Sequence, residues 1–330
     1  MADLSTKYLG LSLKSPVIVG SCGLTSTLEN IQEIESCGAG AVVLKSIFEE
    51  EILLESQDLL NEAKKDKLIY TDLSETLDYL DLHVGEENLG NYIKLIKDAK
   101  KSVSIPIIAS INCVTDFEWI NFATKIQNAG ADALELNIFH NPSDMHINDY
   151  DKITFNIIRK VLKVVSIPVA VKISNCNTNL SFTIQKISES GVAGIVLFNR
   201  FYSPDFDIEN YSVNSANVFS QPQEQVKPLR WIALLSEKVK CSMAASTGIH
   251  HADAVIKQIL AGADAVQVVS TLYLNGIKYL TTINSEIEQW MVKKGIFSLN
   301  QIKGKMAYNK TTNPAVFERM QFMKRYSRIG

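Results

Sequence analysis

Several features that would place this chain of 330 residues in a special class are missing. No run of 18 or more apolar residues occurs, so we expect no membrane-spanning helix. The first residues lack the basic and apolar regions of a signal peptide. The formal net charge is -3 and no cluster of lysine and arginine stands out, so no positive field exists to hold a polyanion. We therefore expect a cytoplasmic protein that binds neither a membrane nor nucleic acid.

Cysteine is also scarce. The five cysteines are widely spread and form no C-x-x-C pair, so they predict reduced thiols rather than a zinc site or a redox relay. A histidine-rich metal cage, a G-x-S-x-G turn and a pair of catalytic carboxylates are missing as well. The sequence therefore predicts no bound metal and no hydrolase activity.

The composition is that of a folded globular protein, with 46% hydrophobic and 21% charged residues. This length allows two ordinary domains or one large barrel of about 250 residues with insertions. The choice depends on internal repetition.

Short apolar runs of two alternating kinds repeat along the chain. One kind, led by proline or cysteine, covers 15–20, 104–110, 166–172 and 241–245, and the other, led by glycine, covers 38–45, 130–137, 191–199 and 262–269. All are nearly continuous in apolar residues and rich in valine and isoleucine, which is typical of parallel strands buried on both faces. Eight strands are therefore predicted.

Segments with helical periodicity lie between these runs. Apolar residues recur at spacings of three and four within 27–36, 116–128, 151–165, 180–190, 252–261 and 274–293. Eight strand and helix units in succession favour an α/β fold of the closed (β/α)8 type, a TIM barrel. The alternative is an open doubly wound sheet, but no G-x-G-x-x-G follows the first predicted strand.

Two connections are too long for simple loops. Residues 47–101 follow the second strand and residues 200–238 follow the sixth, so both insertions leave the catalytic face of the predicted barrel. The first is dense in charge and is expected to contain helices with a solvated face. We expect residues 1–306 to form the barrel and residues 307–330 to form a C-terminal tail.

Polar residues follow the predicted strands where a barrel carries its chemistry. They are Ser21, Lys45, Ser46, Ser110, Asn112, Asn137, Lys172, Asn199, Ser246, Thr247, Gly248, Ser270 and Thr271. Lysines and asparagines with almost no carboxylates predict a site for an anionic or carbonyl-rich planar ligand. Backbone N–H groups after the last two strands suit a phosphate, with ordinary helix N-caps as the alternative.

These residues resemble the FMN-dependent dihydroorotate dehydrogenases, most closely the soluble class. The resemblance runs from residue 8 to about residue 306 and rests on Lys45-Ser46, Leu136-Asn137, Val171-Lys172, Asn199, Thr247-Gly248, Ser270-Thr271 and the segment 290–295. It implies oxidation of (S)-dihydroorotate to orotate in pyrimidine biosynthesis, with hydride transfer to N5 of FMN. The cofactor-binding residues that it implies are Gly20, Ser21, Lys45, Ser46, Ser110, Asn112, Asn137, Lys172, Asn199, Thr247, Gly248, Ser270 and Thr271.

The resemblance also suggests catalytic and substrate-binding residues. The family's Asn-x-Ser-Cys-Pro-Asn loop reads here as residues 137–142, which places His140 where the base should stand. An imidazole suits proton removal, and Lys45 is the second expected catalytic residue. Substrate binding falls to Lys45, Asn137, Asn199 and Arg200. The alternatives are that His140 has no role and that Arg200 is a rim charge.

The chain departs from the family pattern in three places: the base loop, the missing Asn-Ser-x-Gly-x-x-Asn loop after the second strand, and the missing glycine-rich stretch after the sixth. Two further functions therefore stay open, namely an FMN-dependent barrel oxidoreductase with another small substrate and a flavin-binding barrel without turnover. The expected partners are a small-molecule substrate and an electron acceptor that could be fumarate, a quinone or NAD through a partner subunit. A homodimer also stays open. The other four histidines are expected to be structural.

Overall fold

The computed structural model describes residues 2–49, 73–113, 116–139, 150–175, 179–201, 203–312 and 314–317. Within this part of the chain, no helix combines the length and apolar character needed to cross a bilayer. The described cysteines Cys22, Cys37, Cys113 and Cys241 carry free thiols.

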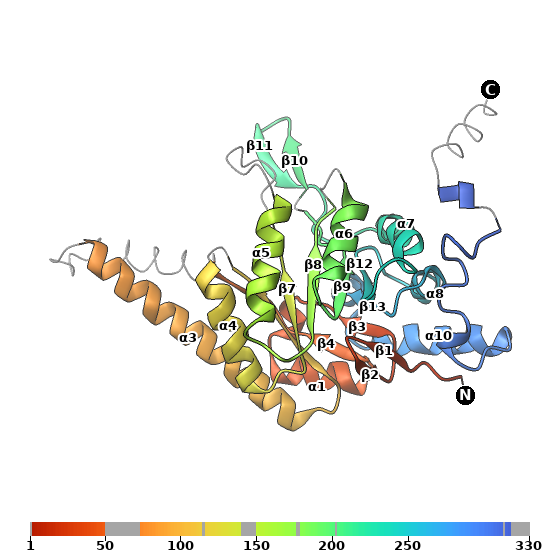
Figure 1. Cartoon of the computed structure of the whole chain (residues 1–330), viewed down its shortest axis with the longest axis horizontal. Helices are drawn as coiled ribbons and strands as arrows, with labels where there is room; N and C mark the ends of the chain where they lie inside the picture. Colours follow the sequence, from red (N-terminus) through yellow and green to blue (C-terminus); the bar gives the residue numbers. More distant parts are fainter. Residues whose placement is uncertain are drawn as a thin grey trace.

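Eight parallel strands of the described chain close into a barrel, which confirms the predicted (β/α)8 fold (Figure 1). They are β3 (Val17–Val19), β4 (Ala41–Val43), β6 (Ile107–Asn112), β7 (Ala133–Asn137), β8 (Val169–Ile173), β9 (Gly194–Leu197), β12 (Ser242–Ser246) and β13 (Ala265–Val268). Pairing of β4 with β6 and of β13 with β3 completes the ring. Each predicted run overlaps one barrel strand, and a further short strand, β5 (Ile47–Phe48), extends the pairing of β6.

Helices surround the barrel (Figure 1). They are α1 (Leu28–Ser36), α3 (Leu73–Ser102), α4 (Asp116–Ala129), α5 (Tyr150–Leu162), α6 (Leu180–Glu189), α7 (Val226–Leu235), α8 (Ala252–Ala261), α9 (Ser270–Asn275) and α10 (Tyr279–Lys293). The single helix expected over 274–293 is wrong at its start. Gly276 adopts φ +80°, a left-handed conformation that ends α9, and α10 begins three residues later.

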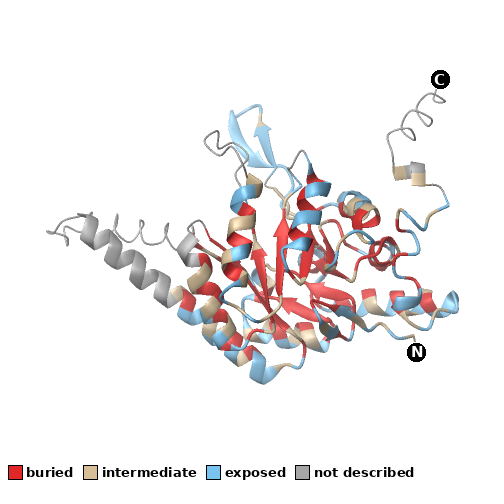
Figure 2. Ribbon diagram, in the orientation of Figure 1, coloured by how far each residue is buried: buried red, intermediate tan, exposed pale blue. Residues whose placement is uncertain are grey.

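A hairpin that the sequence analysis did not predict fills the barrel interior away from the catalytic face. It comprises β1 (Thr6–Tyr8) and β2 (Leu11–Leu13), and its Tyr8 and Leu9 are fully buried among inward-facing strand residues such as Ile18 and Val196. A Cβ atom on Gly194 of β9 would lie 2.4 Å from Leu9 Cδ2, so the Leu9 side chain would have to move if this residue were not glycine. The buried strands are visible at the centre of Figure 2.

Both insertions leave the C-terminal ends of strands, as expected. The first contains α3, whereas its charge-dense part lies outside the described residues. The second forms an exposed hairpin of β10 (Pro204–Asp207) and β11 (Ser212–Ser215), which projects beyond the strand ends (Figures 1 and 2). It then returns through the 3-10 helix η2 (Pro222–Gln225) to α7. This return places residues of the insertion against the barrel mouth.

The chain after α10 packs along α8 and α7. Met306 N donates to Leu260 O at 2.8 Å, and Tyr308 N donates to Ala233 O at 2.8 Å. The division at residue 306 between barrel and tail stays a prediction.

Candidate active site

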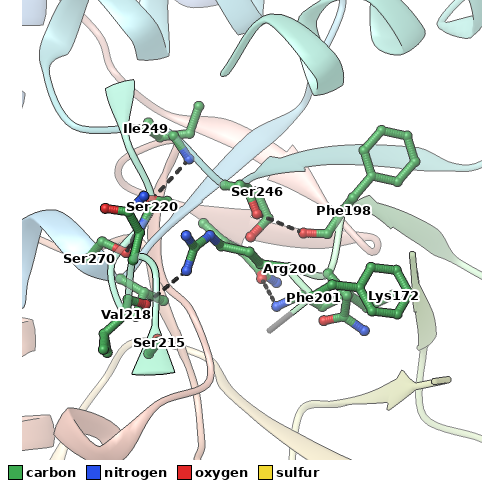
Figure 3. Close-up of a pocket in the computed structure, with 16 residues that line it drawn as sticks. Lys172, Phe198, Arg200, Phe201, Ser215, Val218, Ser220, Ser246, Ile249 and Ser270 are labelled. Atoms are coloured by element: carbon green, nitrogen blue, oxygen red, sulfur yellow. Dashed lines mark hydrogen bonds between the residues drawn. The ribbon is translucent and has the colours of Figure 1, made fainter. Parts of the chain in front are cut away.

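A cavity of about 500 Å³ opens at the C-terminal ends of β8, β9, β12 and β13 (Figure 3). This volume is in the range of small-molecule sites, about 300–1,000 Å³. Residues predicted from the sequence that line it are Lys172, Asn199, Arg200, Ser246, Thr247, Gly248 and Ser270. Four neighbouring strands of the barrel therefore place their strand-end residues around one cavity.

Lys172 on β8 supplies a buried positive charge to this cavity. It is 8% exposed, and its Nζ donates to Gln267 Oε1 of β13 at 3.1 Å. The same Nζ lies 3.8 Å from Glu135 Oε1 of β7, and Gln267 Nε2 donates to Glu135 Oε2 at 2.5 Å. Three neighbouring or facing strands thus fix one ammonium group at the barrel mouth.

Glu135 balances this charge inside the barrel. It is 1% exposed, and burial raises the pKa of its carboxyl group above the ordinary value, while Lys172 and the hydrogen bond from Gln267 act in the opposite direction. Its Oε1 atom has no hydrogen-bond partner, so the carboxylate depends on the nearby ammonium group. The sequence analysis did not single out Glu135 or Gln267, although each is an isolated polar residue within an otherwise apolar strand.

A tight turn after β12 also lines the cavity. Thr247 and Gly248 follow β12 with φ +79° and φ +76°, and a Cβ atom on Gly248 would lie 2.2 Å from Gln225 N. Only glycine fits this approach of the second insertion to the strand end. The expected alternative of ordinary N-caps is wrong here, because His251 precedes α8 and Val269 precedes α9. Thr247 Oγ1 instead donates to Phe198 O at 3.0 Å.

The sequence profile of the family described as dihydroorotate dehydrogenase matches residues 3–291. The chain belongs to this family. It is similar to proteins named "Dihydroorotate dehydrogenase B (NAD(+)), catalytic subunit". The relative from Thermoplasma volcanium is 26% identical over 92% of this chain and 98% of its own length. The relative from Thermoplasma acidophilum is 27% identical over 92% and 99%, and that from Methanocaldococcus jannaschii is 26% identical over 91% and 97%.

Dihydroorotate dehydrogenases are FMN-dependent flavoproteins, and the donor set of this cavity fits FMN. The ammonium group of Lys172 suits an electron-rich ring that becomes negative on reduction, while the hydroxyl group of Ser270 suits a phosphate group. Val218 and Ile249 also line the cavity and supply apolar wall.

Two asparagines connect the cavity with the neighbouring strand. Asn137 ends β7 and Asn199 follows β9, and Asn199 Nδ2 donates to Asn137 Oδ1. Asn199 lines the cavity, whereas Asn137 is connected to it only through its bond to Asn199. The pair that the family resemblance assigns to cofactor and substrate is therefore assembled.

The guanidinium group of Arg200 bonds to other groups of the protein. Its Nη1 donates to Val218 O at 2.8 Å, and its Nε lies 3.3 Å from Glu224 Oε2. These bonds join the start of the second insertion to its returning part, and Figure 3 shows the bond between Arg200 and Val218. A substrate-binding role for Arg200 stays a prediction and would have to use its other N–H donors.

The other predicted residues of the described chain do not line this cavity. Ser21, Ser46 and Ser110 form a hydroxyl chain across β3, β4 and β6, with Oγ to Oγ distances of 3.0 and 2.7 Å. Gly20, Asn112 and Thr271 are buried, and Lys45 is exposed. None of these seven residues is among the described residues that line the cavity. His140 lies outside the described residues, so its role stays a prediction.

Proposed function

We propose that this chain is an FMN-dependent dihydroorotate dehydrogenase that oxidises (S)-dihydroorotate to orotate in the cytoplasm. One observation carries this proposal: the same cavity is lined by a buried, counter-charged ammonium group, that of Lys172, and by a hydroxyl group, that of Ser270. That combination suits FMN, because its ring and its phosphate call for these two kinds of donor.

FMN supplies the hydride acceptor, at its N5 atom. Lys172 would place a positive charge where negative charge develops during reduction, and Gln267 and Glu135 hold that charge in position. Asn199 and Asn137 would orient the substrate, because their mutual bond leaves the Asn137 amide hydrogens and the Asn199 carbonyl oxygen for other partners. His140 would remove the substrate proton, which an imidazole of ordinary pKa near 6.5 is suited to do.

The relatives are named as catalytic subunits, which supports a second subunit as the route for electrons. We therefore expect reduced FMN to pass its electrons to a partner protein rather than to a substrate held by this chain alone. Association into a homodimer stays compatible with this arrangement.

The test is an absorbance spectrum followed by an anaerobic titration with dihydroorotate. The purified protein should be yellow, and one equivalent of dihydroorotate per flavin should bleach it. A colourless protein that refuses added FMN would overturn the proposal.

A second candidate is an oxidoreductase of the same family with another small substrate. The sequence of the base loop, with histidine in place of cysteine, favours this candidate. It predicts yellow protein that dihydroorotate leaves unbleached and another reduced substrate bleaches. Bleaching by dithionite alone would indicate a flavin-binding barrel without turnover.

A further inference from the structure

Ser220 of the second insertion lies at the centre of a small hydrogen-bonded cluster at the phosphate end of the cavity. Its N–H group donates to Ser270 Oγ at 3.0 Å, and its Oγ lies 3.0 Å from the same atom. Ser220 Oγ also lies 3.2 Å from His250 Nε2 and 3.3 Å from Gly248 N. Ser220, Gly248 and Ser270 line the cavity, whereas His250 is 4% exposed and stands behind Ser220.

The direction of these bonds follows from the donor inventory. A serine hydroxyl group has one hydrogen and two lone pairs. Ser220 donates its hydrogen to Ser270 Oγ and accepts from the Gly248 N–H group, which leaves one lone pair. His250 therefore donates to that lone pair from Nε2.

The same count fixes the outcome at Ser270. Its Oγ accepts both the N–H and the O–H group of Ser220, so both of its lone pairs are used. Only its own hydrogen remains, and Ser270 lines the cavity. The hydroxyl group of Ser270 can therefore donate a hydrogen bond into the cavity but has no free lone pair with which to accept one.

Donation from Nε2 requires a proton on that atom, which the imidazolium form and one of the two neutral tautomers of His250 carry. Burial lowers the pKa of its imidazole group, and the neighbouring His251 lowers it further, while a bond to the Ser220 backbone and the charge of Glu224 act in the opposite direction. A neutral imidazole donates from one ring nitrogen only, and the proton belongs on Nε2 if Ser220 is to accept it.

We propose that His250 is a positioning residue for the FMN phosphate, acting through Ser220 to leave the Ser270 hydroxyl group as an obligatory donor. This inference rests on the proposed FMN site. A phosphate oxygen accepts hydrogen bonds only, and bonds to an ionised acceptor are about twice as strong as neutral ones. The cluster therefore favours FMN over riboflavin, which has a neutral hydroxyl group in place of the phosphate.

The experiment compares the affinities of the apoprotein for FMN and for riboflavin by flavin fluorescence titration. His250→Leu and Ser220→Ala should each weaken FMN binding about ten- to a hundredfold, the value of one hydrogen bond to a charged group. Riboflavin binding should change less than about twofold, since the ring contacts are unaffected. His250→Gln keeps a terminal N–H donor and should restore FMN binding.

The adjacent His251 provides the matched control. It is exposed, and its Nδ1 lies 2.9 Å from Tyr279 OH, away from Ser220. His251→Leu removes the charge repulsion on His250 but none of the hydrogen bonds around Ser220, so both affinities should change by less than about twofold.

The outcomes separate the inference from the proposed function. Equal weakening of FMN and riboflavin binding would show a merely structural role and overturn the inference, as would unchanged FMN binding in Ser220→Ala. If His250→Leu does not fold, Ser220→Ala and His250→Gln decide the matter. A wild-type protein that binds neither flavin overturns the proposed function, and the inference with it.

Discussion

The two sides of the barrel mouth carry similar polar residues but differ in what those residues do. At β8, β9, β12 and β13 they face a cavity, with Lys172 buried beside a counter-charge. At β3, β4 and β6 the hydroxyl groups of Ser21, Ser46 and Ser110 bond to one another, and Lys45 is exposed. Within the described residues, a position at a strand end is therefore not enough to place a side chain in this cavity.

The strongest test of this comparison pairs the two strand-end lysines. Lys172→Ala should destabilise the protein by about 3–5 kcal/mol, because it leaves Glu135 buried without its counter-charge. It should also weaken FMN binding, measured by the flavin content of the purified protein and by titration. Lys45→Ala should destabilise the protein by less than Lys172→Ala, since Lys45 is exposed and its loss leaves no known buried carboxylate behind. Equal losses of stability and flavin in both variants would remove the distinction between the two sides.

His140 tests whether the loop after β7 completes the site. His140→Ala should slow reduction of the flavin by dihydroorotate at least about a hundredfold, the usual contribution of a general base, while flavin stays bound. Anaerobic stopped-flow measurement of the first turnover isolates this step. His83, which lies outside the predicted motifs, is the control, and His83→Ala should react at the wild-type rate. An unchanged first turnover in His140→Ala would exclude His140 as the base.

The barrel could be predicted because each strand buried on both faces leaves a short apolar run in the sequence. Lys172, Thr247 and Ser270 could be predicted as well, since they directly follow such runs. Short elements could not be predicted. The strands of the β1 and β2 hairpin have three residues each, which is too few for a hydrophobic pattern to be recognised. Ser220 escaped for another reason, because it lies in an insertion without periodicity and gains its partners only by tertiary packing.

Buried polar residues within strands were also missed by the sequence analysis. Glu135 and Gln267 occupy runs whose apolar neighbours dominate the pattern, and their sequence positions do not reveal that they meet across the barrel. An isolated polar residue in a buried strand is nevertheless a usable signal, because burial requires a partner.

Two glycines with left-handed backbones sharpen the comparison between the packed cavity wall and the open surface. Gly248→Ala should destabilise the protein by about 2–4 kcal/mol, because the added Cβ meets Gln225 N as well as an unfavourable φ. Gly276→Ala meets open space, so it should cost only the backbone strain of φ +80° and ψ 161°, about 1–3 kcal/mol. Thermal unfolding of both variants measures the difference. Equal losses of stability in the two variants would mean that the backbone at Gln225 moves aside for the added Cβ at little cost.

The smallest effect concerns the pH dependence of stability at the cavity floor. Because burial raises the pKa of Glu135, the folded protein keeps a proton that the unfolded chain has already lost, so this group lowers stability as pH rises above about 4.5. Glu135→Gln cannot lose a proton. Its free energy of unfolding relative to wild type should therefore increase with pH, by at most about 1.4 kcal/mol per pH unit, until Glu135 ionises in the folded state. Urea denaturation between pH 4 and about 7 measures this slope. Glu286→Gln, at an exposed position on α10, should run parallel to wild type, and a parallel Glu135→Gln would show that the carboxyl group ionises as easily inside the barrel as in water.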